Sequence, residues 1–182
     1  MSKGKTILKE GKFRLTLERL TQQLIEEYGD FENTCILGIQ EKGVELAERI
    51  LDLVNKKKKK NKLQFGKLDT TFYRDDFRTH GMPLKASNTD IEFILDNKNV
   101  ILVDDVLYTG RTILSALSAM QDFGRPANVQ LLVMVDRRFN RHLPIQPDFT
   151  GIVVDSVDEA YVRVIYDKEK ISDQIILFPL KD

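Results

Sequence analysis

Two adjacent carboxylates and a short hydroxyl-rich loop are the residues of this sequence best suited to chemistry. Asp104 and Asp105 follow an apolar run at 100–103 and precede a loop, YTGRT, at 108–112. Residues 113–123 then have helical apolar spacing, so the loop leads into a helix N-terminus. Free N–H groups at a helix N-terminus bind phosphate, and paired carboxylates accept hydrogen bonds from neighbouring ribose hydroxyls. This order of elements predicts a site for a phosphorylated ribose.

Neither of two common nucleotide-binding motifs explains this loop. It holds one glycine, Gly110, whereas the dinucleotide fingerprint needs three. No Gly-Lys-Ser/Thr follows, which excludes a Walker A loop. Gly110 allows a sharp turn and a close approach of the backbone to a phosphate. Each part alone could be an ordinary strand end or turn, but the complete order favours ligand binding.

Residues 99–112, NVILVDDVLYTGRT, resemble the phosphoribosyl pyrophosphate (PRPP) signature of the type I phosphoribosyltransferases. The form with LYTGRT is similar to that of the PyrR family, whose members are pyrimidine operon regulators and uracil phosphoribosyltransferases. The similarity continues in CILGIQEKGVELAERI, FYRDD, GRPANVQLLVMVDR and LPI. It therefore covers most of the chain from residue 35 to about residue 151.

The resemblance implies a role for each of these segments. Asp104 and Asp105 would hold the ribose hydroxyls, and Arg74 would neutralise charge on the diphosphate, which makes these three the expected catalytic residues. The expected PRPP-binding residues are Val103, Asp104, Asp105, Val106, Leu107, Tyr108, Thr109, Gly110, Arg111 and Thr112. The expected diphosphate loop comprises Gln40, Glu41, Lys42 and Gly43. The expected base-binding residues are Val135, Asp136 and Arg137.

Some of these assignments have a plain structural alternative. Family members commonly carry a threonine and a basic residue near Glu41 and Lys42, and Glu41 would repel a diphosphate, so we expect its side chain to point away. Arg74 could instead form a surface ion pair with one of the aspartates at 75–76. Residues 136–137 could form a local ion pair.

Composition limits the class of protein. The 182 residues correspond to one domain, and the 28 basic and 28 acidic residues cancel, which argues against a general polyanion binder. The single cysteine, Cys35, lies in an apolar run and indicates a buried thiol, and two histidines add no metal-binding cluster. The absence of a signal-like segment or long apolar run predicts a cytoplasmic protein. The lysines at 56–60 suit either a solvated loop or a nucleic-acid patch.

The apolar runs at 34–39 and 129–135 are typical of buried strands of a parallel sheet. We therefore expect an α/β protein, with a mostly parallel central sheet flanked by helices and a small hood, as in the type I phosphoribosyltransferase fold. One domain should span 1–182, with a flexible loop at about 75–90 and a hood formed by about 137–182 plus the N-terminal segment.

The implied reaction converts uracil and PRPP into UMP and diphosphate. Mg²⁺ would be carried by PRPP and water, and no direct protein ligand to the metal is expected. A phosphoribosyltransferase for another base, such as a purine, is an alternative, and so is a non-catalytic, nucleotide-sensing RNA-binding regulator. The resemblance also implies a homodimer or a higher homo-oligomer.

Binding to an mRNA leader, in response to UMP, is a second activity implied by the family. Attenuating members have a helix similar to LTRIAHEM, whereas residues 17–24 read LERLTQQL. Glu18 adds negative charge, and Ile152 replaces a usual lysine, so both changes weaken RNA binding. Arg14 and Arg19 could still contact RNA phosphates.

Overall fold

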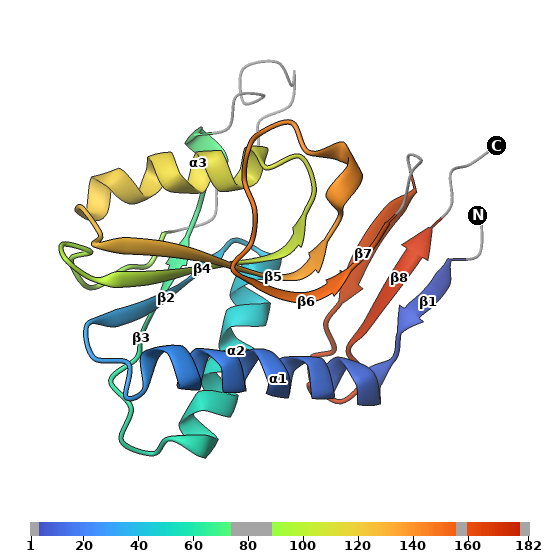
Figure 1. Ribbon diagram of the computed structural model, residues 1–182, viewed down its shortest axis with the longest axis horizontal. Coiled ribbons are helices and arrows are strands. Elements are labelled where there is room, and N and C mark those ends of the chain that lie inside the picture. Colours follow the sequence, from blue (N-terminus) through green and yellow to red (C-terminus); the bar gives the residue numbers. More distant parts are fainter. Residues whose placement is uncertain (1–3, 74–88, 156–159, 179–182) are drawn as a thin grey trace.

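The structure is a computed structural model that describes residues 4–73, 89–155 and 160–178. Its main sheet has five parallel strands in the order β3-β2-β4-β5-β6 (Figure 1). These strands are β2 (Thr34–Ile39), β3 (Gln64–Leu68), β4 (Asn99–Leu107), β5 (Asn128–Asp136) and β6 (Phe149–Val153). The α-helices are α1 (Glu10–Tyr28), α2 (Lys42–Lys57) and α3 (Arg111–Met120). This arrangement confirms the predicted α/β class.

The helices cover both faces of the main sheet, α1 and α2 on one face and α3 on the other (Figure 1). Side chains of residues 100–103 in β4 alternate between these faces. Ile101 and Val103 join the core cluster that contains α1 and α2 residues. Val100 and Leu102 join the cluster that contains α3 residues. Because both faces are buried, the strand needs a continuous apolar sequence rather than an alternating one.

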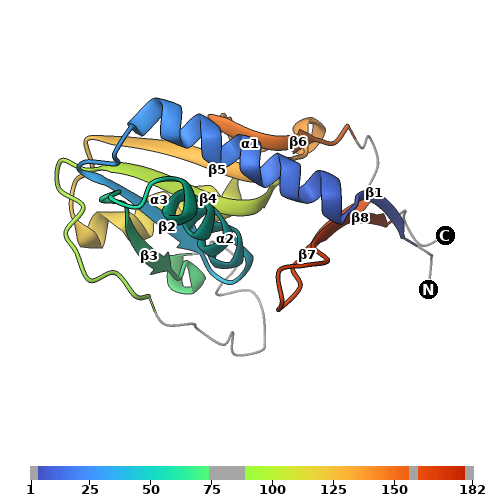
Figure 2. The same ribbon diagram turned by 90° about the horizontal axis from the view of Figure 1, so that it is seen from below.

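A second, antiparallel sheet stands beyond the end of the main sheet (Figure 2). It has the order β1-β8-β7, with β1 (Lys5–Leu8), β7 (Tyr161–Ile165) and β8 (Gln174–Phe178). The N-terminal segment is thus an edge strand beside the C-terminal strand. β6 falls within the range 137–182 expected for the hood, but it pairs with β5 in the main sheet. We propose that the hood consists of the second sheet.

Local hydrogen bonds and charges explain where two elements end. Strand β3 ends at Leu68, because the Asp69 carboxylate accepts bonds from the amide and hydroxyl of Thr71 and starts a turn. A 3₁₀ turn, Thr71–Tyr73, follows. Helix α2 extends into the lysine run, where positive charge at its C-terminus is favourable.

The expected flexible loop at 75–90 lies almost entirely outside the described residues. Of this range only residues 89 and 90 are described, and Asp90 forms an antiparallel bridge with Lys67. No helix in the described ranges is long and apolar enough to cross a membrane.

Candidate active site

The two carboxylates lie side by side in β4, near the carboxyl edge of the main sheet. Asp104 is buried, and its Oδ1 accepts a hydrogen bond of 2.9 Å from the Asp105 amide. Burial raises the pKa of Asp104 well above its usual range, and the charge of Asp105 raises it further. Burial also raises the pKa of Asp105, against the lowering effect of Lys42. A buried acidic pair of this kind needs hydrogen-bond donors or cations around it.

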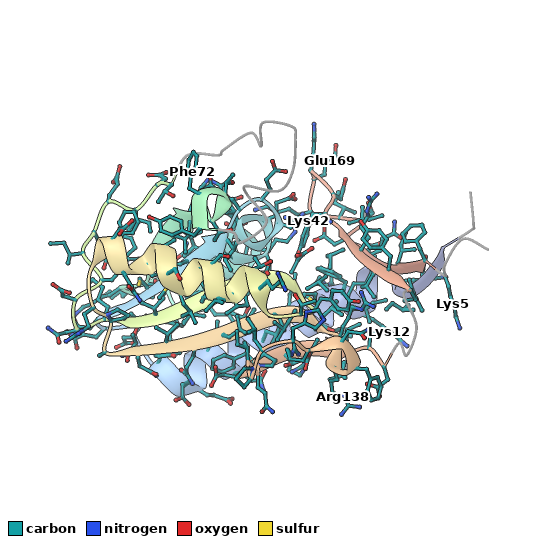
Figure 3. All side chains as sticks on the ribbon, turned by 90° about the horizontal axis from the view of Figure 1, so that it is seen from above. Lys5, Lys12, Lys42, Phe72, Arg138 and Glu169 are labelled. Carbon is teal, nitrogen blue, oxygen red and sulfur yellow. The ribbon has the colours of Figure 1, made fainter. Side chains whose placement is uncertain are left out.

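Lys42, the first residue of α2, is the cation that the structure places beside this pair. Its Nζ lies 3.7 Å from Oδ2 of Asp105 and donates a hydrogen bond of 2.7 Å to the carbonyl oxygen of Val164 in β7. Figure 3 shows Lys42 on the side of α2 that faces the β7–β8 hairpin. Lys42 therefore connects the acidic pair to the second sheet.

The expected diphosphate loop lies directly on β4. A Cβ at Gly43 would be 2.4 Å from the carbonyl oxygen of Val103 and 3.2 Å from Cα of Asp104, so only glycine allows this approach. The peptide bond between Gln40 and Glu41 is cis, and the Gln40 amide bonds to the end of β3. The Glu41 side chain is exposed. The loop and the acidic pair are thus adjacent.

The phosphate-sized loop connects β4 to α3 at the same edge. Gly110 is the N-cap of α3 and has a φ of 93°, a conformation that favours glycine. Ile145 packs over it, because a Cβ at Gly110 would be 3.3 Å from Cδ1 of Ile145. The amide of Arg111 lies 3.4 Å from Oγ1 of Thr109. The loop is preorganised at a helix N-terminus, as an anion site requires.

Not every residue of the PRPP signature can offer its side chain to a ligand. Val103 and Leu107 are buried in the two core clusters, and Val106 is half-buried against one of them. Val135, expected to contact the base, is also fully buried in the core. Any contact from these buried residues would come from the backbone.

The expected base site lies where β5 ends. Asp136 pairs with Arg141, which also donates a 2.9 Å hydrogen bond to the carbonyl oxygen of Tyr108. The Arg137 guanidinium lies 4.0 Å from the centre of the Tyr108 ring. The structure therefore gives Asp136 a partner other than its neighbour Arg137. Sequence analysis missed Arg141, and nothing in the spacing of residues identified it.

The two arginines proposed for RNA binding have different surroundings on α1. Arg14 is exposed and lies 3.7 Å from Glu18. Arg19 donates hydrogen bonds of 3.0 and 2.6 Å to the carbonyl oxygens of Thr150 and Gly151 in β6. Both arginines are exposed, but Arg19 already donates to the backbone of β6. Arg74, the third expected catalytic residue, lies outside the described residues.

A domain family and several solved structures are similar to this chain. Residues 3–168 match the phosphoribosyl transferase domain family. A hypoxanthine-guanine phosphoribosyltransferase from Bacillus anthracis superposes with a TM-score of 0.68 at 16% identity, over 89% of this chain and 88% of its own. A hypoxanthine phosphoribosyltransferase from Staphylococcus aureus gives a TM-score of 0.65 at 16% identity, over 87% and 79%. At this identity the likenesses show the fold alone.

Sequence relatives define the family more narrowly. A protein from Caldicellulosiruptor bescii is 39% identical over 177 residues, which cover 97% of this chain and 96% of the relative. A protein from Picosynechococcus sp. is 44% identical over 158 residues, 87% of this chain and 88% of the relative. Both are named bifunctional protein PyrR. The chain belongs to the PyrR family of phosphoribosyltransferases, as the residues of its PRPP signature predicted.

Proposed function

We propose that the protein transfers the phosphoribosyl group of PRPP to uracil, forming UMP and releasing diphosphate. One observation carries this proposal: the acidic pair lies between the diphosphate loop, which touches β4 at Gly43, and the loop at the N-terminus of α3. A ligand with diphosphate at one end, phosphate at the other and a ribose between them matches this order. Ligands of parallel α/β sheets bind at this edge.

Positioning supplies most of the catalysis in this scheme. Asp104 and Asp105 hold the 2′ and 3′ hydroxyls, backbone N–H groups at Gly110 and Arg111 hold the 5′-phosphate, and the diphosphate lies along residues 40–43. Orienting two reactants in this way can contribute up to about 7–11 kcal/mol. The base nitrogen displaces the diphosphate at C1 of the ribose, and the protein forms no covalent bond.

The family resemblance implies that Mg²⁺ is carried by the ligand and by water rather than by direct protein ligands. The two carboxylates can meet the water shell of Mg²⁺, which keeps several waters when it binds phosphorylated ligands. When bound, Mg²⁺ supplies positive charge that stabilises the leaving diphosphate.

We propose uracil rather than a purine because the sequence relatives are PyrR proteins. The fold alone does not indicate which base is used. Within the site, the buried Arg137 guanidinium packs on the exposed ring of Tyr108 beside the end of β4. A small planar base could pack there and take polar contacts from neighbouring backbone. A homodimeric, cytoplasmic enzyme remains the expectation from the family resemblance.

We also propose mRNA binding as a second function, supported by the name bifunctional protein PyrR among the relatives. In this chain the surface available for it on α1 includes the exposed Arg14, whereas Arg19 is bonded to β6. An RNA site on α1 would therefore use Arg14 but not Arg19.

The experiment that tests the enzyme is PRPP-dependent UMP formation by the wild type and by the Asp104→Asn, Asp105→Asn double variant. The wild type should form UMP and the folded double variant should not, because neutral amides lose the charge-assisted bonds to ribose. Normal turnover by the folded variant would contradict the assignment.

A further inference from the structure

A buried ion pair fixes the turn that follows β7. Nε and Nη2 of Arg49 donate hydrogen bonds of 2.6 and 2.8 Å to the two carboxylate oxygens of Asp173, and Nη2 also donates to the carbonyl oxygen of Asp167 at 2.7 Å. The Asp167 amide donates to the same Asp173 carboxylate at 2.7 Å. These bonds connect α2 to the β7–β8 hairpin. They also fix the backbone of Asp167 and so the position of the preceding residue, Tyr166.

Tyr166 has a well-packed ring and a hydroxyl without a partner. The Arg49 guanidinium lies 4.6 Å from the ring centre, and Phe13 packs edge-on at 6.0 Å. In the part of the chain that the structure describes, the buried hydroxyl oxygen has no hydrogen-bond partner. Burial and the charge of Asp105 raise the pKa of Tyr166, so the hydroxyl keeps its proton and remains a donor. Buried donors almost always have an acceptor, so this one requires an explanation.

The acceptor that the structure suggests is Asp105. Tyr166 and Val106, the residue after Asp105, both pack against the same core cluster. The charge of Asp105, more than that of Asp104, raises the pKa of Tyr166, so the phenol lies near this end of β4. Lys42 reaches the same place from α2 and joins Asp105 to Val164, two residues before Tyr166. Asp105 thus has two candidate partners, an ammonium and a phenol.

A bound diphosphate would compete with Asp105 for the Lys42 ammonium but not for the Tyr166 hydroxyl. Lys42 belongs to the expected diphosphate loop, and a diphosphate attracts its ammonium more strongly than one carboxylate at 3.7 Å does. Asp105 would then lose part of its compensation while it must accept hydrogen bonds from the ribose. We propose that Tyr166 is a positioning residue that donates its hydrogen bond to Asp105, directly or through one ordered water, when Lys42 turns to the diphosphate. This inference rests on the proposed function.

The test compares two ligands that share the ribose 5-phosphate but differ in the diphosphate. Calorimetry would measure PRPP, with Mg²⁺, and UMP binding to the wild type and to Tyr166→Phe. We expect the Kd for PRPP to rise about tenfold, the effect of losing a hydrogen bond to a charged group. The Kd for UMP should stay within about twofold, because Lys42 remains with Asp105. Without ligand, the variant should melt no lower than the wild type, since it loses only an unpaired hydroxyl.

Two controls separate this role from a structural one. Tyr161→Phe makes the same change at an exposed position of β7, the strand that precedes Tyr166, and should alter neither affinity. In a Lys42→Met background Asp105 lacks the ammonium with either ligand, so Tyr166→Phe should then weaken UMP binding as well as PRPP binding.

Three results would overturn the inference. Unchanged PRPP affinity in Tyr166→Phe would show that the hydroxyl is not used. Equal weakening of PRPP and UMP in the otherwise unaltered protein would show a general structural role. Failure of the wild type itself to bind PRPP would instead overturn the proposed function, and the inference with it. The wild-type measurement therefore distinguishes the two failures.

Discussion

The backbone of Gly43 lies in contact with the backbone of Val103, so close that a Cβ at Gly43 would be 2.4 Å from the Val103 carbonyl oxygen. The diphosphate loop and the strand that carries the acidic pair are therefore fixed relative to each other. Backbone against backbone leaves no flexible side chain to give way. In the proposed binding mode, this contact fixes the distance between the diphosphate loop and the acidic pair.

Replacing Gly43 with alanine should separate the loop from β4 and impair PRPP binding. We expect the Kd for PRPP to rise by roughly tenfold or more, since misplacement of a binding group by about 1 Å can cost a hundredfold in rate. Calorimetric titration with PRPP measures this directly. Gly11→Ala is the matched control, because a Cβ there meets nothing within 4 Å and alanine favours helix α1. Equal affinities for all three proteins would contradict the fixed contact.

Removing the charge of Asp104 should change the pH dependence of stability. Burial raises the pKa of Asp104, so the folded protein holds this proton more tightly than the unfolded chain, where the pKa is about 3.9. The contribution of Asp104 to stability therefore grows as pH falls through its folded pKa and is complete below about 3.9. Asp104→Asn removes this contribution.

Urea unfolding of both proteins at pH 7 and pH 5 measures how this contribution of Asp104 to stability changes with pH. The stability of the wild type minus that of Asp104→Asn should increase on going from pH 7 to pH 5. At pH 7 the variant should be at least as stable as the wild type, because an amide costs less to bury than a charge. If the stability of the wild type minus that of Asp104→Asn decreases toward pH 5, the surroundings favour the ionised carboxylate, which would contradict a raised pKa.

The sequence predicted the elements that a local pattern specifies. Three features could be recognised from residues that are adjacent in the sequence: the apolar run at 129–135, the acidic pair and the loop before α3. At these positions the structure has a strand, two neighbouring carboxylates in a strand and a helix N-terminus. The role of glycine at position 110 also followed from local geometry, and its φ of 93° agrees. The PyrR-like segments extended this prediction over most of the chain from residue 35 to about residue 151.

Contacts between distant parts of the chain could not be predicted in the same way. Arg49 and Asp173 are 124 residues apart, and neither lies in a pattern that marks a buried partner. The pairing of β1 with β8 depends on how the chain ends meet, which apolar spacing does not specify. Lys42 was expected at the diphosphate, but its bond to β7 required the second sheet to be placed.

The Arg49–Asp173 pair should be important for stability. Asp173→Asn removes the bidentate, buried counter-charge of the Arg49 guanidinium and leaves the half-exposed Glu45 carboxylate at 3.9 Å, and we expect a loss of about 3 kcal/mol in the free energy of unfolding. Urea denaturation monitored by circular dichroism measures it. Asp155→Asn is a matched control, since the Arg138–Asp155 pair is exposed and its loss should leave the midpoint nearly unchanged. Similar midpoints for both variants would show that the buried pair does not hold the second sheet.

If α1 binds RNA, Arg14 and Arg19 should fail in different ways. Arg14→Ala should weaken a gel shift with leader RNA and reduce the salt slope by about one, without a change in stability. Arg19→Ala should lower stability, because two carbonyls of β6 lose their donor. Arg125→Ala makes the same charge change beyond α3 and should leave RNA binding unchanged. No shift at low salt, with or without UMP, would remove RNA binding as a function.

The most direct test of the central claim is nucleotide formation from PRPP and Mg²⁺ with uracil, hypoxanthine, guanine and orotate offered in parallel. We expect UMP from uracil and no product from the other three bases. Product from a purine would keep the PRPP site at Asp104 and Asp105 but contradict the assignment of the base site at the end of β5. A folded protein that binds PRPP and converts none of the four bases would contradict the enzyme and leave the nucleotide-sensing regulator.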